Sequence, residues 1–232
     1  MPTAAANWPV PLPTLALRGE AVRLEPLAPA HERELLDICQ DEQIWRYLTS
    51  YGGTPEAMHE YLQAALRDYA SGSALPFVIR AAGGDVSDGA AGDGSHGTTR
   101  DGSAGNDASD GRVIGMTRLK NLSRANRSAV VGSWLAPAAW GSGANTESKL
   151  LLLTHAFETL GCIRTEFHTD SRNLRSRAAL TKMGAQEEGT LRSCHIRRDG
   201  SRRDTVVFSI LDAEWPAVKQ KLLARLQAQM AK

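Results

Sequence analysis

The segment WGSGANTESKLLLLTHAF, residues 140–157, places two glycines immediately before a long apolar stretch of helical character. Gly141 and Gly143 allow main-chain φ values that other residues resist, and they let a ligand approach the backbone. The first N–H groups of a helix have no partner inside the helix, and the helix dipole makes that end positive. The segment therefore predicts an anion site suited to a phosphate or a pyrophosphate.

Two observations limit what this glycine loop can establish alone. A G-x-G spacing is weak evidence, so a plain strand-to-helix turn with Asn145 or Thr146 as the N-cap stays open. The loop also lacks the G-K-[S/T] sequence of a Walker loop, which disfavours nucleoside triphosphate hydrolysis. A second motif is needed to choose between a turn and a ligand site.

The rest of the chain reads as a succession of strands and amphipathic helices. Because the strands follow one another before and after helices rather than alternating strictly with them, we expect an α+β fold. Its sheet should be mixed and mostly antiparallel, of about seven strands, with helices on both faces. The expected strands lie near 20–27, 75–82, 112–122, 128–136, 163–170, 187–197 and 204–211, and the expected helices at 29–40, 41–48, 54–72, 144–160, 174–183 and from 212 onward.

One internal segment departs from this pattern. Residues 83–111 are rich in glycine and aspartate, with Val86 as their one large aliphatic residue. Such a segment buries too little apolar surface to offset its ordering entropy, so we expect it to be disordered. Its flanks look like paired strands, so it should replace a short hairpin turn, which the logarithmic cost of loop closure allows. A docking or regulatory loop is the alternative.

Composition excludes several classes of protein. A net charge of +1 provides no basic field for nucleic acid. The three cysteines are scattered, which argues against disulfides and structural zinc and suits a reducing cytosol. No apolar run approaches the roughly 20 residues of a membrane span, and the proline-rich extension 1–17 has no basic start like that of a signal peptide. We therefore expect a soluble cytoplasmic protein without a metal site.

The second motif follows the strand at 163–170. There Asn173 can cap the next helix, and Ser176 lies three residues on, at the same end. Taken together, W-G-x-G-A, N-x-x-S-R, M-G-A and the late RRDTVVFSILDAEW resemble the GNAT acetyltransferases, most closely their RimJ/RimL-type branch, which acetylates amino groups with acetyl-CoA. The resemblance implies a GNAT domain at 18–218, without the segment 83–111, followed by the end of a C-terminal helix at 219–232.

The resemblance also implies where coenzyme A would lie. In such enzymes two neighbouring strands splay apart, and the pantetheine arm occupies the gap like an added strand. Asn173 would bond the pantetheine amides, and Ser176 would lie near the sulfur. Main-chain groups of Ser133, Trp134 and Leu135 would pair with the arm, and the pyrophosphate would be held by Gly141, Ser142, Gly143, Ala144, Asn145 and Thr146.

The implied reaction is direct attack of a neutral primary amine on the thioester. A donor must stabilise the developing oxyanion, and the main-chain N–H near Leu135 is the candidate. Ser176 could supply the proton or hydrogen bond that the leaving thiolate needs. No cysteine lies in either motif, so we expect no acyl-enzyme.

The base that deprotonates the amine is the part that the resemblance does not supply. Many relatives carry glutamate at the position of Val130, and valine cannot accept a proton. Glu166 and His168 share one face of the strand 163–170 and are the candidates, although both could equally be surface residues of the sheet. Glu147 is expected to stabilise the helix dipole rather than to act as a base.

The acceptor amine is open between a protein N-terminus and a small molecule. Trp45, Tyr47 and Tyr51 could line its pocket or simply pack in the core. The basic run at 196–204 reads as a hairpin with Asp-Gly in its turn, and its arginines could attract an acidic acceptor or the 3′-phosphate of coenzyme A. Alternatives to an acetyltransferase are another acyl-CoA donor or a CoA-binding sensor without catalysis. A homodimer is possible for this branch.

Overall fold

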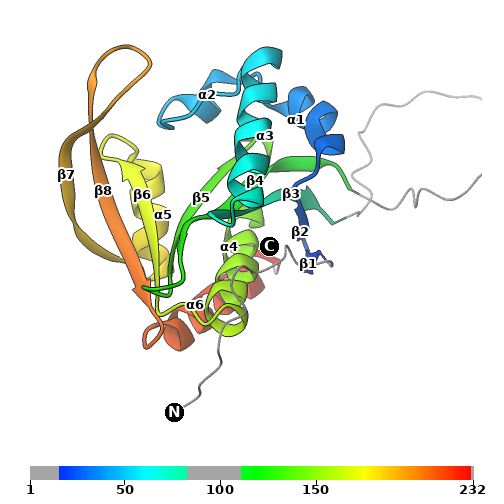
Figure 1. Cartoon of the computed structure of the whole chain (residues 1–232). Coiled ribbons are helices and arrows are strands. Elements are labelled where there is room, and N and C mark those ends of the chain that lie inside the picture. Colours follow the sequence, from blue (N-terminus) through cyan, green and yellow to red (C-terminus); the bar gives the residue numbers. More distant parts are fainter. Residues whose placement is uncertain (1–15, 83–110, 231–232) are drawn as a thin grey trace, which may run out of the picture.

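The computed structural model describes residues 16–82 and 111–230, which form one mixed sheet covered by helices (Figure 1). The eight strands have the order β1-β2-β3-β4-β5-β6-β8-β7. Every neighbouring pair is antiparallel except β5 and β6, which are parallel. The strands are β1 Leu17–Arg18, β2 Val22–Pro26, β3 Ala74–Ala81, β4 Val113–Ser123, β5 Ser128–Leu135, β6 Arg164–Asp170, β7 Gln186–Ile196 and β8 Arg202–Leu211.

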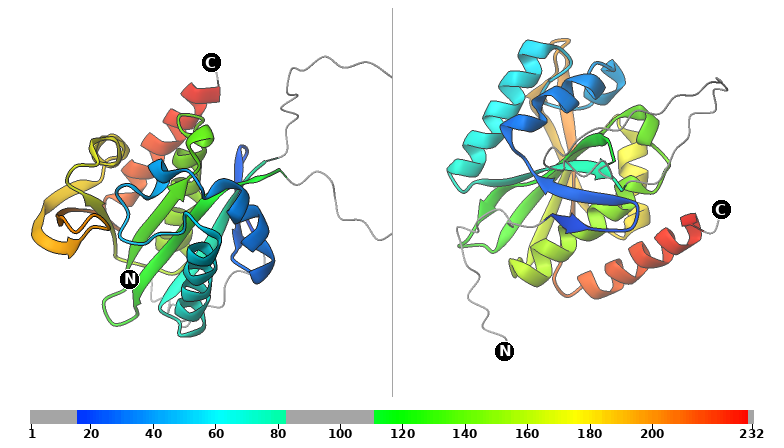
Figure 2. Two further views of the ribbon diagram at one scale, coloured as in Figure 1. Left: turned by 90° about the horizontal axis from the view of Figure 1, so that it is seen from above. Right: turned by 90° about the vertical axis from the view of Figure 1, so that its right-hand side faces the viewer.

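Side chains that alternate along the strands pack into two separate hydrophobic cores. Phe77 and Ile79 of β3 pack toward one face, and Val78 between them packs toward the other. The first core holds residues of α4, α5 and α6, and the second holds residues of α1, α2 and α3, so helices cover both faces (Figure 2). These helices are α1 Glu32–Ile38, α2 Glu42–Trp45, α3 Pro55–Ala70, α4 Ala144–Thr154, α5 Leu174–Met183 and α6 Trp215–Met230.

The expected α+β class and the mostly antiparallel sheet are confirmed, with one strand more than expected. Residues 17 and 18 form the short β1, which pairs with β2, so the fold begins inside the expected extension 1–17. A two-residue strand has no side-chain periodicity for a sequence pattern to detect. At the other end, Val218 and Leu222 of α6 are buried in the first core, so the C-terminal helix belongs to the domain.

Several helix boundaries follow from their capping residues. The side chain of Thr54 accepts a hydrogen bond from the N–H of Ala57, with Pro55 in the first turn of α3. The α5 helix ends at Gly184, whose φ of 105° suits glycine. The expected helix at 144–160 is α4 followed by a π-helical turn at His155–Thr159, which sequence periodicity cannot distinguish from α-helix.

Residues 83–110 lie outside the described residues, and with them nearly all of the segment expected to be disordered. The strands on either side of it are antiparallel neighbours, and the N–H of Ala81 donates to the carbonyl of Arg112 at 3.0 Å. The segment therefore connects two adjacent ends of a hairpin, as expected. In the described part of the chain, no helix is long and apolar enough to cross a bilayer.

Candidate active site

The centre of the sheet opens between its two parallel strands. β5 and β6 are paired only from Ser128 with Arg164 to Val131 with Phe167. Beyond that point β6 continues its pairing with β8, while β5 continues with β4, so the two strands separate. A cavity of about 600 Å³ begins in this gap and extends to the glycine loop and to the β7–β8 hairpin.

Two residues of β5 turn their main-chain groups into the gap. The N–H of Ala136 donates to the carbonyl of Ile114 on the β4 side, and antiparallel pairing alternates from residue to residue. Trp134 therefore uses its main chain to bond β4, whereas Ser133 and Leu135 face the gap. The carbonyl of Leu135 accepts a bond from the Trp140 indole at 3.0 Å. Of the three residues expected to pair with a ligand, Ser133 and Leu135 thus turn main-chain groups toward the gap, whereas the main chain of Trp134 bonds β4 and its side chain is buried in the second core.

The glycine loop starts α4 without a side-chain cap. Gly143 is the N-cap residue with a φ of 89°, so neither Asn145 nor Thr146 caps the helix, and both lie in its first turn. Gly141 has a φ of 84° and open space where a side chain would be. The N–H of Ala144 donates to the Ser142 hydroxyl at 3.3 Å and that of Thr146 to the carbonyl of Gly143 at 2.8 Å, so the N–H groups of Gly143 and Asn145 are the ones placed for a ligand at this helix end. Of the six residues expected to hold an anion, the cavity is lined by Gly141, Gly143, Asn145 and Thr146, but not by Ser142 or Ala144.

Positive and polar side chains from two other helices surround this loop. The guanidinium of Arg175, in the first turn of α5, stacks on the Trp140 ring at 3.4 Å from its centroid. Arg225 and Gln229 of α6 line the same end of the cavity. The Oε1 atom of Gln229 is buried without a hydrogen-bond partner. Sequence reasoning did not find these three residues, because only the packing of α5 and α6 brings them to the loop.

The expected pair at the start of α5 is present. The Oδ1 atom of Asn173 accepts a hydrogen bond from the N–H of Ser176 at 3.0 Å, which confirms the N-cap. Both residues line the cavity. The cap holds the Ser176 hydroxyl in the first turn of α5, on the wall that faces β5.

Lys149 is a buried cation that the sequence reading missed. It lies on α4 with 8% of its surface exposed, and its Nζ atom donates to the Ser133 hydroxyl at 2.5 Å. That hydroxyl also lies 2.6 Å from the hydroxyl of Thr117. Burial lowers the pKa of Lys149 to about 8. The sequence signal that could have indicated this buried cation is a lysine next to the run of leucines at 150–153.

Glu166 and His168 are in contact, but only one of them reaches the cavity. The Nε2 atom of His168 lies 2.8 Å from Oε2 of Glu166, and Arg164 donates to the other carboxylate oxygen at 3.0 Å. His168 lines the cavity with 30% of its side chain exposed, whereas Glu166 does not line it. Hydrogen bonds from His168 and Arg164 outweigh burial and lower the pKa of Glu166, which keeps it ionised. Val130 is buried beside Glu166 on β5.

Glu147 lies in the first turn of α4, where its negative charge suits the helix dipole as expected, and it also has a structural role. Its carboxylate is buried and accepts hydrogen bonds from the N–H groups of Glu20, Ala21 and Val22 at 2.8, 2.8 and 2.7 Å. It therefore fastens the β1–β2 turn to α4. Gly19 is needed there, because a Cβ atom would lie 2.4 Å from the carboxylate carbon.

The far end of the cavity is formed by β4, α2 and the β7–β8 hairpin. Tyr47 lines it, whereas Trp45 is buried in the second core. Tyr51 instead supports the hairpin: its ring lies 3.6 Å from the guanidinium of Arg198, and its hydroxyl donates to Glu42.

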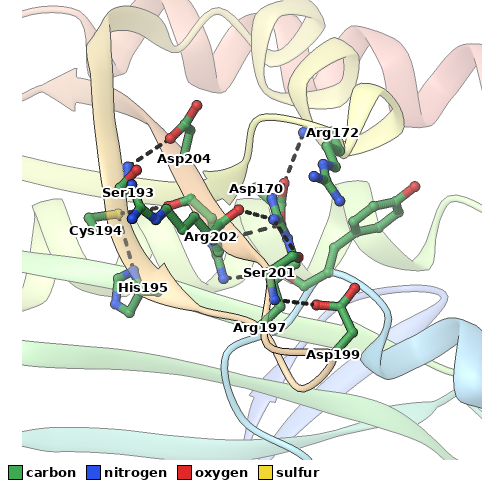
Figure 3. A network of polar contacts seen from close by, with 12 residues as sticks. Asp170, Arg172, Ser193, Cys194, His195, Arg197, Asp199, Ser201, Arg202 and Asp204 are labelled. Carbon is green, nitrogen blue, oxygen red and sulfur yellow. Dashed lines mark hydrogen bonds and ion pairs between the residues drawn. The ribbon is translucent and has the colours of Figure 1, made fainter.

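The hairpin is anchored to the sheet by an ion pair. Arg197 reaches from the hairpin to the buried Asp170 at the end of β6, with distances of 2.7 and 2.9 Å (Figure 3). The turn carries Gly200 with a φ of 78°, in agreement with the expected Asp-Gly turn. Across residues 16–82 and 111–230, no three His, Cys, Asp or Glu side chains gather as a metal site would require.

Known proteins with the same fold and related sequences were found in three comparisons. Residues 21–186 match the family model described as "Acetyltransferase (GNAT) domain". The curated relative "Putative ribosomal N-acetyltransferase YdaF" of Bacillus subtilis (strain 168) is 36% identical over 110 residues, 47% of this chain and 60% of the relative. A second relative from that organism, "Uncharacterized N-acetyltransferase YoaA", is 31% identical over 43% of this chain and 55% of its own length. The chain thus spans little more than half of these curated relatives.

Solved structures cover more of the chain. A GCN5-related N-acetyltransferase from Brucella melitensis has a TM-score of 0.73 and 29% identity, covering 95% of this chain and 90% of that one. Mycobacterium smegmatis RimJ, solved in complex with CoA-disulfide, has a TM-score of 0.67 at 23% identity, covers 88% of each chain and supports the fold alone. The family match extends over most of the described strands, the glycine loop and the Asn173–Ser176 cap, and the chain therefore belongs to the GNAT acetyltransferase family.

Proposed function

We propose that the protein is an acetyl-CoA-dependent N-acetyltransferase that acts on a primary amine. The observation that carries this proposal is the gap between β5 and β6, which leads from the start of α4, where no side chain caps Gly143, into the cavity. A diphosphate suits the first feature, and an extended amide-containing arm suits the second. Family membership supports an acyl-CoA as the donor.

The residues around the gap would contact coenzyme A as follows. The main-chain groups of Ser133 and the N–H of Leu135 would bond the pantetheine arm, and Asn173 would add an amide contact. Gly141, Gly143, Asn145 and Thr146 would hold the pyrophosphate. Arg175 and Arg225, which flank the loop, would neutralise its charge. When bound, the thioester supplies an activated acetyl group.

The chemical step needs a proton acceptor, an oxyanion donor and a proton donor. We assign the first role to His168, with Glu166 holding the imidazole by its hydrogen bond, so that the amine proton moves to the free ring nitrogen. The N–H of Leu135 would stabilise the carbonyl oxygen while the new N–C bond forms and the C–S bond breaks. The Ser176 hydroxyl would give its hydrogen bond or proton to the thiolate.

Lys149 adds a positive charge beneath the same gap. Its ammonium is held by Ser133, which lies in the part of β5 that does not pair with β6. A cation there stabilises negative charge that develops in the gap, because burial weakens the screening of its field. It would thus complement the Leu135 N–H rather than replace it.

A protein N-terminus is one acceptor candidate, because the curated relative YdaF carries a name that refers to ribosomal N-acetylation. A small amine is the other. A CoA-binding sensor without catalysis is the second candidate function, favoured by the buried Val130 beside Glu166. Turnover separates the two functions.

The test compares binding with turnover in the purified chain. Calorimetry should detect coenzyme A binding, and labelled acetyl-CoA should transfer its acetyl group to members of an amine and peptide panel. Binding without transfer to any amine would support the sensor, and no binding would end both proposals.

A pair of glycine variants tests the assigned cofactor site. Gly141→Ala should weaken coenzyme A binding by at least about tenfold, since its methyl group would stand where the ligand approaches. Gly200→Ala is the matched control, because Gly200 also has positive φ and open space around it but lies in the hairpin turn. Equal affinities for the two variants would contradict the site.

A further inference from the structure

The cavity has a strongly one-sided charge. Among the described residues that line it, none is Asp or Glu, whereas its cationic side chains are Arg118, Lys120, Lys149, Arg175, Arg203 and Arg225. Arg175 and Arg225 lie at the glycine loop and Lys149 beneath the gap, where the proposed coenzyme provides negative charge. The remaining three lie at the far end, where the amine would enter.

These three far-end cations converge from different strands. Arg118 and Lys120 are two residues apart on β4 and share a face of the sheet, while Arg203 comes from β8, paired with His195 of β7. Burial lowers the pKa of Lys120, and the charges of Arg118 and Arg203 lower it further. Burial also lowers the pKa of His195, with added effects of Arg203, Lys120 and His168. All of these groups line the same cavity, and their charges act on one another there.

Two carboxylates lie near these cations, each at the long limit of an ion pair. Asp170 makes its short bonds with Arg197 and lies 3.8 Å from Arg203, whose Nε atom is buried without a hydrogen-bond partner. Asp68 is 3.9 Å from Arg118 and half exposed. The residue opposite Lys120 on β5 is Val130, which cannot neutralise it. Arg203 and Arg118 therefore each have one carboxylate at the edge of ion-pair distance, whereas Lys120 has no such contact among the described residues. A partly buried ammonium without a partner is costly, so an anion beside Lys120 would complete the site.

The β7–β8 hairpin contacts the α2 region at this end of the cavity. Arg198 at the hairpin tip contacts Glu42 at 3.0 Å and Tyr51, and Arg203 donates to the main-chain carbonyl of Tyr47 at 3.3 Å. These contacts join the hairpin to the α2 region across the mouth of the cavity. The Arg198–Glu42 pair is exposed and therefore adds little to the stability of this contact.

We infer that the acceptor is a small primary amine that also carries a carboxylate or a phosphate. Its anionic group would bind Lys120 and Arg203, and its amine would then lie toward His168. This inference rests on the proposed function, because it specifies the substrate class of the same site. It predicts selection by charge rather than by an apolar side chain.

The test uses matched amines that differ only in the anionic group. Phosphoethanolamine is compared with ethanolamine, and β-alanine with β-alaninamide, which also separates phosphate from carboxylate as the preferred anion. In at least one pair, kcat/KM for the anionic member should exceed that of the neutral member by about tenfold or more, as expected for a buried charge pair. A neutral dipeptide is included to represent a protein N-terminus.

Three variants assign the preference to the far-end cations. Lys120→Met should reduce the anionic-to-neutral ratio by about tenfold while leaving the acetyl-CoA KM unchanged, and Lys120→Arg should retain most of the preference. Lys182→Met, which removes an exposed lysine of α5, should behave as the wild type.

The outcomes separate the inference from the function on which it rests. Equal or better turnover of the neutral amines or of the dipeptide would overturn the inference and leave the acetyltransferase intact. If no amine is acetylated, the function fails, and the inference is decided by calorimetry with phosphoethanolamine and β-alanine. Binding that Lys120→Met abolishes would support it, and absence of binding would overturn it.

Discussion

The Nζ atom of Lys149 lies 2.5 Å from the Oγ atom of Ser133, and this bond joins α4 to the half of β5 that does not pair with β6. The contact holds a buried ammonium beneath the gap where the sheet opens. It connects the helix that begins at the glycine loop with the strand that would carry the pantetheine arm. The stability and the activity of the protein should both respond to this pair.

Replacing Lys149 by methionine should make stability less dependent on pH. The folded-state pKa of about 8 lies below the ordinary lysine value of 10.5, so between these two pH values the unfolded chain binds more protons than the folded one. The free energy of unfolding of the wild type therefore increases as pH rises above 8. Below pH 8 it is reduced by the full cost of burying the charged ammonium. Lys149→Met should be more stable than the wild type at pH 7 by about 2 kcal/mol, and the difference should shrink toward pH 10.

Urea unfolding at pH 7 and pH 9.5 measures this difference. Lys182→Met serves as the control, because it removes an exposed lysine and should show no such pH-dependent difference. A constant offset between Lys149→Met and wild type at both pH values would contradict a buried, charged Lys149.

Ser176→Ala should separate chemistry from binding. The Asn173 cap bonds the Ser176 main-chain N–H, not its hydroxyl, so the helix start should survive the change. We expect kcat to fall by about tenfold or more, as for the loss of a proton donor, with coenzyme A affinity changed by less than about twofold. Steady-state kinetics and calorimetry provide the two values. Unchanged kcat would remove the proposed role of the hydroxyl.

Glu166 should act only through His168. His168→Gln should lower kcat by about 100-fold, and Glu166→Gln by a smaller factor, since it leaves the base in place but no longer holds it. The double variant should have the same kcat as His168→Gln alone. A double-mutant cycle on kcat measures this. Additive losses would mean that Glu166 contacts the reacting groups by another route.

Glu147→Gln should destabilise the fold. The buried carboxylate accepts three main-chain N–H groups of the β1–β2 turn, and an amide presents one acceptor where there were two. We expect a loss of about 2–3 kcal/mol in the free energy of unfolding, from denaturant titration. Glu60→Gln, on the exposed face of α3, is the control and should change stability by less than about 0.5 kcal/mol. A similarly small effect of Glu147→Gln would contradict the role of this carboxylate in fastening the β1–β2 turn to α4.

Replacing residues 83–110 by a short turn should leave the enzyme active. Ala81 and Arg112 already meet across the β3–β4 hairpin, so a few residues can close it. Shortening the loop should raise the free energy of unfolding by about 1–2 kcal/mol through its closure entropy. Activity assays and denaturant titration on the shortened chain test both statements. A loss of kcat/KM at retained stability would show that the segment contributes to function.

Local signals in the sequence were sufficient for the elements and for one side of the site. Period-two and period-3.6 patterns, Thr54 and Asn173 as caps, and the glycines at 143 and 184 are all determined by nearest neighbours along the chain. The glycine loop and the Asn173–Ser176 pair could be found for that reason. Strand β1 could not be found, because two residues show no side-chain periodicity. The N-cap of α4 was expected at Asn145 or Thr146 but is Gly143, a residue that has no side chain to indicate a cap.

The chain order alone thus determined the α+β elements, the helix start that favours an anion and the family resemblance. Only the tertiary structure decided that Lys149 lies beneath the gap, that His168 rather than Glu166 faces the cavity, and that Lys120 and Arg203 converge. Residues on different strands and helices meet because the sheet pairs β5 with β6 for four residues and then lets them part. That separation depends on long-range packing, which side-chain periodicity within one segment does not encode.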